Sequence, residues 1–82
     1  MTAEGVKQLY ESLAQSLQAF GATSANIIKE TIYTTDIEKM KELNDIRKVF
    51  YEGDFPASTW VQVSRLYEPS AMLEVDLIAI IE

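Results

Sequence analysis

The chain has 82 residues and an acidic composition: 13 Asp and Glu against 7 Lys and Arg give a net charge of −6, with no Cys and no His. The length predicts a single small domain. The missing residue types exclude disulfides, thiol nucleophiles, histidine general bases and the usual His or Cys metal sites, so we expect no metal and no cofactor. The acidity argues against nucleic acid as the main partner, because nucleic-acid affinity depends on clustered Lys and Arg.

The short length also bears on stability and assembly. A chain of this size buries only about 60 to 65% of its unfolded surface, so association with further copies is the remaining source of support. The longest apolar run of the C-terminal half, residues 77–81, is far shorter than the roughly 20 residues that span a bilayer, and the N-terminus lacks a signal-peptide pattern. We therefore expect a cytoplasmic protein without a membrane contact.

The first half of the sequence predicts a helix and a strand. Apolar side chains recur at three- and four-residue spacing along residues 3–20, which is typical of one helical face; Thr2 is placed to cap this helix and Gly21 to end it. Residues 26–34 are rich in β-branched side chains and contain no Gly or Pro, and they predict a strand.

The second half predicts one more helix and two strands. Asp36 is a good N-cap for a helix over residues 37–51, which a segment containing Gly and Pro ends. The apolar spacing of this helix includes Ile37, Met40, Leu43, Arg47 and Phe50. Alternation of apolar and polar side chains predicts strands over residues 59–66 and 72–81, joined by a turn at 67–70.

The element order αβαββ predicts an α+β fold, with two helices packed on one face of a mixed sheet. We expect a βαβ crossover between the first two strands and an antiparallel C-terminal hairpin, whose last strand is central. The sheet face opposite the helices is expected to carry Trp60, Met72, Ile78 and Ile80. An apolar face of this kind indicates an interface and supports an oligomer.

Glu74 and Asp76 form the most suggestive group of polar residues. They are two positions apart on the last predicted strand, so both carboxylates are expected on one face, together with Trp60, Gln62 and Ser64 of the neighbouring strand. Paired carboxylates on a partly apolar face can exchange protons or orient a water molecule. A structural role at a sheet end or subunit contact is the alternative, and the spacing alone favours it.

The second predicted helix carries an amide and a set of mixed charges. Asn44 has poor helix propensity, and a ligand contact, a loop contact and simple exposure to solvent all remain open. Basic residues of this helix are interleaved with acidic ones at helical spacing: Lys39, Lys41, Arg47 and Lys48 alternate with Glu38, Glu42 and Asp45. This pattern favours an exposed face of ion pairs over a basic binding patch.

Several sequence segments, taken together, follow the order and spacing of a known protein family. They are residues 13–22 and 27–36, Asn44 with Val49-Phe50, the Phe55-Pro56-Ala57 turn, and residues 61–66 and 73–80. The combined pattern covers essentially the whole chain and resembles the Rid family, also called YjgF or L-PSP endoribonuclease-like. The resemblance implies a chorismate-mutase-like fold assembled as a homotrimer, with small-metabolite clefts between subunits. It also implies that residues 1–82 form one domain that lacks the N-terminal strands of the family.

Characterised members of this family are imine/enamine deaminases that act on 2-imino acids, and some were described as ribonucleases or translation inhibitors. The resemblance implies that Glu74 positions the attacking water and that Asn44 contacts the substrate. The family arginine that grips the substrate carboxylate corresponds to Ser58 here, and a frequent cysteine corresponds to Trp60, whose bulk narrows the cleft.

Three functions follow as hypotheses. The first is a trimeric protein with a divergent cleft that binds a small metabolite and has weak or no deaminase activity. The second is a deaminase-like hydrolase of 2-iminobutanoate, 2-iminopropanoate or an uncharged analogue. In it Glu74 orients water, Asn44 contacts the substrate, and Ser58 or a backbone N–H donates a neutral hydrogen bond. The third, an endoribonuclease or translation inhibitor, is opposed by the charge of −6.

Overall fold

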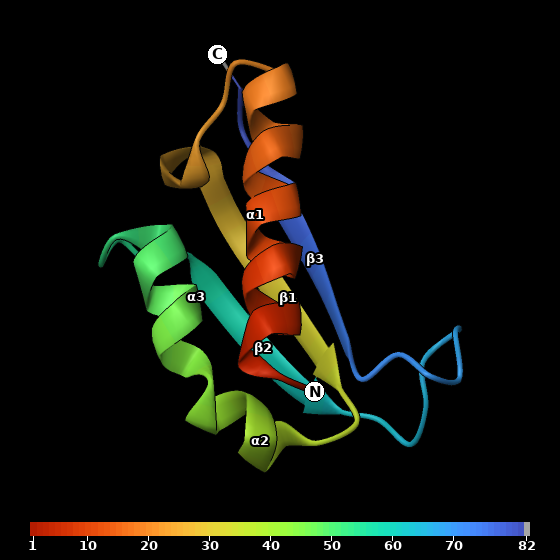
Figure 1. Cartoon of the computed structure of the whole chain (residues 1–82). Helices are drawn as coiled ribbons and strands as arrows, with labels where there is room; N and C mark the ends of the chain where they lie inside the picture. The colour runs from red at the N-terminus through yellow and green to blue at the C-terminus, as the bar shows by residue number, and fades with distance from the viewer. Residues whose placement is uncertain (82) are drawn as a thin grey trace.

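The computed structural model describes residues 1–81, which form three α-helices, one short 3-10 helix and three strands (Figure 1). In chain order the elements are α1 (Ala3–Ala19), η1 (Ser24–Asn26), β1 (Ile27–Thr34), α2 (Ile37–Glu42), α3 (Asn44–Tyr51), β2 (Ala57–Gln62) and β3 (Leu73–Ala79). The predicted order is confirmed, with the second helix divided in two. No helix within residues 1–81 is long and apolar enough to cross a membrane.

Helix α1 begins and ends close to where the sequence predicts. The Thr2 hydroxyl accepts a hydrogen bond from the backbone N–H of Gly5 at 3.1 Å. Gly21, with φ at 73°, takes the left-handed conformation that follows the end of the helix. Val6 and Tyr10 are buried, and Leu9, Leu13 and Leu17 pack against the core, so α1 presents an apolar face to the rest of the molecule.

The second predicted helix, over residues 37–51, is divided at Leu43 into α2 and α3. Asp36 caps α2 as predicted, because its carboxylate accepts a hydrogen bond from the N–H of Lys39 at 3.1 Å. Leu43 has φ −96° and ψ 7°, away from regular helical values, and α3 begins at the next residue. Asn44 therefore lies at a helix start, where Asn is well tolerated, and the predicted position in a helix interior is wrong.

Strand β1 is the centre of a mixed sheet with the order β2-β1-β3. It pairs with β2 in parallel and with β3 in antiparallel orientation. The predicted crossover is confirmed, since α2 and α3 connect two parallel neighbours. The predicted C-terminal hairpin with a central last strand is wrong, because β3 pairs with β1 and not with β2.

The connection between β2 and β3 explains this difference. It runs over residues 63–72, longer than the two to five residues of common hairpin loops, and passes the end of β1 (Figure 1). On one side of β1 the N–H of Val63 donates to the C=O of Thr34 at 2.9 Å; on the other the N–H of Thr35 donates to the C=O of Met72 at 3.1 Å. The long connection therefore brings β3 to the far edge of the central strand.

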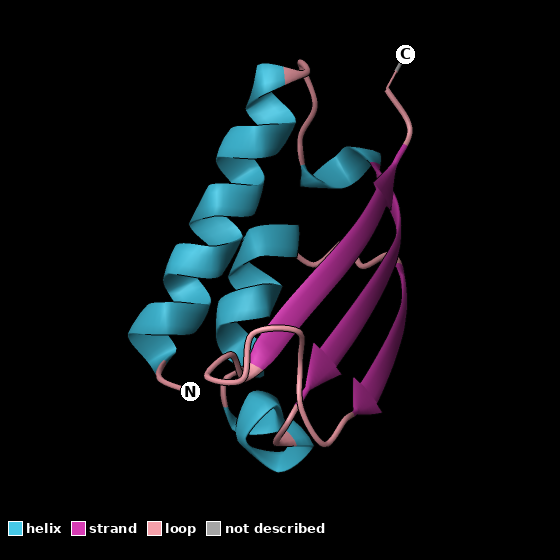
Figure 2. Ribbon diagram, turned by 90° about the vertical axis from the view of Figure 1, so that its right-hand side faces the viewer, coloured by secondary structure: helices cyan, strands magenta, loops and turns pink. Residues whose placement is uncertain are grey.

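Figure 2 shows α1 and α3 on one face of the sheet, whereas no helix of the described chain covers the other face. Six buried side chains form the core: Val6, Tyr10, Ile27, Ile32, Met40 and Tyr51. Trp60 stands opposite the fully buried Ile32 in the sheet register, so it lies on the covered face. Its predicted place on the bare face is wrong, because both alternating sets of β2 contain apolar residues. Met72, Ile78 and Ile80 are exposed, as expected.

Candidate functional site

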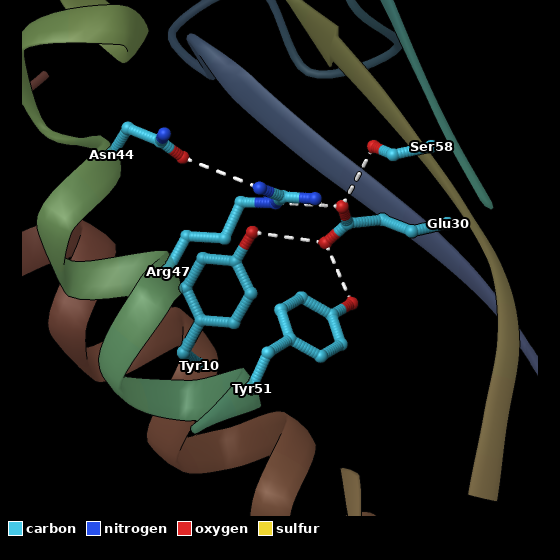
Figure 3. A network of polar contacts seen from close by, with 6 residues as sticks. All are labelled: Tyr10, Glu30, Asn44, Arg47, Tyr51 and Ser58. Carbon is cyan, nitrogen blue, oxygen red and sulfur yellow. Dashed lines mark hydrogen bonds and ion pairs between the residues drawn. The ribbon is translucent and has the colours of Figure 1, made fainter. Parts of the chain in front are cut away.

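A completely buried carboxylate, that of Glu30 on β1, is the centre of a polar network between the sheet and the helices (Figure 3). Its Oε1 accepts from the Nε of Arg47 at 2.7 Å and from the hydroxyl of Ser58 at 2.9 Å. Its Oε2 accepts from the hydroxyl of Tyr51 at 2.7 Å and from that of Tyr10 at 3.2 Å. Four donors from α1, α3 and β2 thus converge on one carboxylate.

The local structure explains why these side chains meet. The register places Glu30 directly opposite Ser58, with both side chains on the helix-covered face. Arg47 and Tyr51 are four residues apart on α3, so they lie on one helical face. Tyr10 lies on the buried face of α1.

The network satisfies the hydrogen-bonding capacity of the ion at its centre. A carboxylate offers about four acceptor sites, and four donors occupy them here. In residues 1–81 no buried side-chain nitrogen or oxygen lacks a hydrogen-bond partner. Burying an ion without a partner is costly, so the pair of Glu30 and Arg47 is what makes a charge tolerable in this core.

Arg47 is held on several sides. Its side chain is only 8% exposed. The guanidinium carbon lies 5.2 Å, 5.0 Å and 5.6 Å from the ring centres of Tyr51, Phe55 and Trp60, within the range of cation–π attraction. A longer hydrogen bond, of 3.4 Å, runs from its Nη1 to the Oδ1 of Asn44.

The two tyrosines act as fixed donors. Burial and the negative charge of Glu30 raise the pKa of the Tyr10 hydroxyl well above its ordinary range. Burial and the hydrogen bond to Glu30 do the same for the pKa of the Tyr51 hydroxyl. Both hydroxyls therefore stay protonated near neutral pH and donate to the carboxylate.

Three of the predicted site residues lie around this network and one does not. Asn44, Ser58 and Trp60 all adjoin Arg47 or Glu30. Glu74 stands opposite Tyr33 in the register of β1 and β3, and the alternation of these strands places it on the bare face. Its role in positioning water stays a prediction.

The predicted grouping around Glu74 and Asp76 is confirmed in part. These two residues share a face of β3, but Trp60 and Gln62 lie on the opposite side of the sheet, and Ser64 lies beyond β2. Gln62 serves the fold, since its Oε1 accepts from the N–H of Ile37 at 2.9 Å, at the start of α2. The prediction that Glu74 and Asp76 share their face with Trp60, Gln62 and Ser64 is therefore wrong.

The predicted exposed face of ion pairs on α2 and α3 is confirmed for the lysines and wrong for Arg47. Lys39, Lys41 and Lys48 form exposed pairs with Glu42, Glu38 and Asp45. Arg47 instead follows the inward spacing that it shares with Met40 in the sequence.

Sequence reasoning missed Glu30 as a site residue, together with its partners Tyr10 and Tyr51. One signal was present: Glu30 stands between β-branched residues of a predicted strand, while Arg47 occupies an apolar position of a predicted helix. Two inward-facing charges of opposite sign favour a buried pair, because neither is tolerated in a core alone.

Two open cavities adjoin α1, and Tyr10 of the network is among the residues that line the second. One, of about 570 Å³, runs between α1 and β3 and includes Leu9, Leu13 and Glu74 in its lining. Another, of about 400 Å³, lies between α1 and α3 and is mostly apolar, with Val49 and Phe50 in its lining. In residues 1–81 no group of His, Cys, Asp or Glu could hold a metal ion.

Comparisons with known proteins identify the family. Residues 1–81 match the family described as Endoribonuclease L-PSP. The 2-iminobutanoate/2-iminopropanoate deaminase of Rattus norvegicus is 33% identical over 78 residues, which are 95% of this chain and 56% of that protein. A RutC family protein of Aquifex aeolicus is 35% identical over 79 residues, 94% of this chain and 62% of that protein. The chain therefore spans about three fifths of the length of these relatives.

Solved structures agree with this match. The Rid family protein YyfA from Yersinia pestis has a TM-score of 0.76 and 34% identity, covering 84% of this chain and 55% of that one. A member of the YjgF/YER057c/UK114 family from Mycobacterium tuberculosis has a TM-score of 0.75 and 26% identity, covering 84% of this chain and 58% of that one. The predicted Rid-like α+β fold is confirmed, and the chain belongs to the Endoribonuclease L-PSP family, that is, to the Rid or YjgF proteins.

Proposed function

We propose that this protein binds a small metabolite, with weak or no deaminase activity toward 2-imino acids. The observation that carries the proposal is that both Ser58 and Arg47 donate hydrogen bonds to the buried Glu30 carboxylate. The resemblance implies a carboxylate-gripping arginine at position 58, where this chain has a serine whose hydroxyl is bonded to Glu30 at 2.9 Å. The nearby Arg47 is bonded to the same carboxylate at 2.7 Å.

This arrangement offers little to an anionic ligand. The charge of Arg47 is balanced by Glu30, and its side chain is almost entirely buried. A ligand carboxylate would have to share a guanidinium whose charge Glu30 already balances through the bond to Nε, so it would gain less than from an unpaired arginine. A 2-imino acid would therefore be held less well than in a site with an available arginine.

The cleft itself is proposed to form between copies of this chain in a homotrimer. The bare sheet face supports this proposal, since Val61 and Ile78 are exposed large apolar residues in the strands β2 and β3. Glu74 and Asp76 lie on the same side as Ile78 in the alternation of β3. A second copy packed against this face would bring further groups close to both carboxylates and complete a site.

An imine deaminase is the second candidate. The rat and human relatives are named 2-iminobutanoate/2-iminopropanoate deaminase, at 33% and 32% identity over 78 residues. In that reaction water adds to the C=N carbon, and the imine nitrogen leaves as ammonia, so an imine and water become a ketone and ammonia. Glu74 would take a proton from the attacking water and return one to the leaving nitrogen. The exposure of its carboxylate on the bare face supports such a role.

The ribonuclease hypothesis has the least support. The lysines of α2 and α3 are paired with carboxylates, and the net charge is −6. A surface that follows a phosphate backbone needs clustered, available cations. We infer that nucleic acid is not the main ligand.

A deaminase assay on freshly generated 2-iminobutanoate tests the proposal. We expect turnover that is weak or absent when measured beside a deaminase of this family at equal concentration. Strong turnover that disappears in Glu74→Ala would overturn our preference and establish the second candidate. Glu68→Ala is the matched control, because it removes an exposed carboxylate of the loop before β3 and should leave any turnover unchanged.

A further inference from the structure

The outer edge of β3 pairs with no strand of residues 1–81, because β3 ends the sheet order β2-β1-β3 (Figure 1). On the inner side the C=O of Met72 accepts from the N–H of Thr35. At the other end of the strand the N–H of Ile80 donates to the C=O of Asn26. Backbone groups alternate in direction along an antiparallel strand, so every second residue between these two ends turns its N–H and C=O outward. The outward residues are Leu73, Val75, Leu77 and Ala79.

The side-chain packing beside this edge is also open. On the helix-covered face the inward Ile32 of β1 is completely buried, whereas the inward Leu73 and Val75 of β3 are only half-buried. A groove of about 570 Å³ separates this edge from α1, with Leu9 and Leu13 on its helical wall. An apolar wall beside a free strand edge fits one more strand, since every second side chain of that strand would fill the groove.

The charge beside the edge decides which strand fits. Glu74 and Asp76 lie on the bare face of β3, and within residues 1–81 neither forms an ion pair. Their register neighbours toward β1 are Tyr33 and Thr31, so only their outer flank is open. Basic side chains of an added strand would pair favourably with both carboxylates there. A second copy of β3 fits poorly, because it would bring its own two carboxylates to the same flank, and like charges directly opposite destabilise a strand pair.

We propose that the groove between α1 and β3 is a strand-addition site for an extended segment of another protein, in which apolar residues alternate with Lys or Arg. The segment pairs antiparallel with β3, and main-chain hydrogen bonds to the outward groups of β3 provide the affinity. Its apolar side chains enter the groove beside Leu9 and Leu13, and its basic side chains lie beside Glu74 and Asp76. The inference goes beyond the proposed function and does not depend on it.

A synthetic peptide tests the proposal. It has seven residues, the length of β3, with Val and Lys in alternation and both ends blocked. Fluorescence polarisation of the labelled peptide measures its affinity for the folded protein. We expect at least about tenfold tighter binding than for a peptide with Glu in place of Lys, or for one with the same residues in two blocks.

Methylation of the peptide backbone separates strand pairing from attraction of charge. In an antiparallel pair the N–H groups of the valines face β3, and those of the lysines face away. Methylating the nitrogens of the two middle valines should therefore reduce the affinity at least about tenfold. The matched control carries the methyl groups on the backbone nitrogens of two lysines and should bind as the unmodified peptide does.

Variants of the protein locate the site. Val75→Pro removes an outward N–H and no hydrogen bond to β1, so it should abolish binding and leave the far-ultraviolet circular dichroism unchanged. Asp76→Lys should weaken binding at least about fivefold. Glu11→Lys, in the lining of the other cavity, makes the same change of net charge and should leave the affinity nearly unchanged. Hydrogen exchange gives a second measurement, because the amides of Leu73, Val75 and Leu77 should gain protection when the peptide binds.

Four results would contradict the proposal. They are absence of binding, equal binding of the block peptide, affinity that survives methylation of the valines, and binding that leaves the outward amides of β3 unprotected. Outward amides that are already protected in the free protein, increasingly so at higher concentration, would show that a second copy occupies the edge, and would overturn the proposal too.

Discussion

The two faces of the sheet use carboxylates in opposite ways. On the helix-covered face Glu30 is completely buried and accepts four hydrogen bonds. On the bare face Glu74 and Asp76 are exposed, and within residues 1–81 neither carboxylate forms an ion pair. A fully bonded carboxylate cannot take up a proton or a ligand without loss, whereas an exposed one is available for chemistry. The covered face therefore stabilises the fold, and the bare face is the side on which we expect association between copies and any chemistry of Glu74.

Loss of the buried charge should have the largest effect. Glu30→Gln leaves the Arg47 guanidinium in the core without its counter-ion, and we expect the free energy of unfolding to fall by about 3–5 kcal/mol. Urea unfolding followed by circular dichroism measures this change. Glu74→Gln, the same substitution on the bare face, should change stability by less than about 0.5 kcal/mol.

A second variant makes this comparison stricter. Glu30→Leu combined with Arg47→Met removes both charges, so it should destabilise less than Glu30→Gln alone. Equal stability of Glu30→Gln and the unaltered protein would contradict the role of the network.

The tyrosine hydroxyls should show an intermediate effect that depends on pH. Tyr51→Phe removes a hydrogen bond of 2.7 Å to a charged group and should cost about 1.5–3 kcal/mol at neutral pH. Tyr10→Phe removes a longer bond, of 3.2 Å, and should cost less. Unfolding free energies from urea titration, with Tyr67→Phe as an exposed control, measure both changes.

The raised pKa of each tyrosine gives the sign of the pH dependence. Burial raises the pKa of both hydroxyls above the ordinary 10.0, so above about pH 10 the unfolded chain releases protons that the folded chain keeps. The stabilisation is complete below pH 10 and is lost as the pH rises, by up to about 1.4 kcal/mol per pH unit for each tyrosine. Tyr51→Phe should reduce this slope between pH 9 and 11, and an unchanged slope would contradict the assignment.

Local sequence patterns predicted most helices and strands correctly, but they could not predict which strands pair in the sheet. The helix predicted over residues 3–20 and the strand over 26–34 agree with α1 and β1 to within a residue, because caps and spacing act over a few positions. The strands predicted over 59–66 and 72–81 are longer than β2 and β3. Alternation does not say which strands are neighbours, so the central place of β1 could not be predicted.

The same limit applies to the site. Asn44, Ser58 and Trp60 were predicted from the family resemblance, and the fold brings them near one another around Arg47. The helical spacing includes Arg47 among apolar positions, but Glu30 taken alone reads as a surface residue of a strand. Their burial depends on a partner 17 positions away in the sequence, and no local pattern reports that partner.

The bare face should respond to substitution in assembly and hardly in fold, which is the smallest of the expected stability effects. Ile78→Glu places a charge on this face, opposite Lys29 in the register, where a carboxylate is well tolerated in the single chain. We expect its far-ultraviolet circular dichroism to match that of the unaltered protein. The mass from light scattering should fall from three chains of 9.3 kDa each toward one, because the charge would be buried between copies. Val49→Glu, an exposed apolar site on α3, is the control and should leave the mass unchanged. A stable monomer of the unaltered protein at micromolar concentration would contradict the proposed trimer. A trimer that survives Ile78→Glu would show that association does not use the bare face.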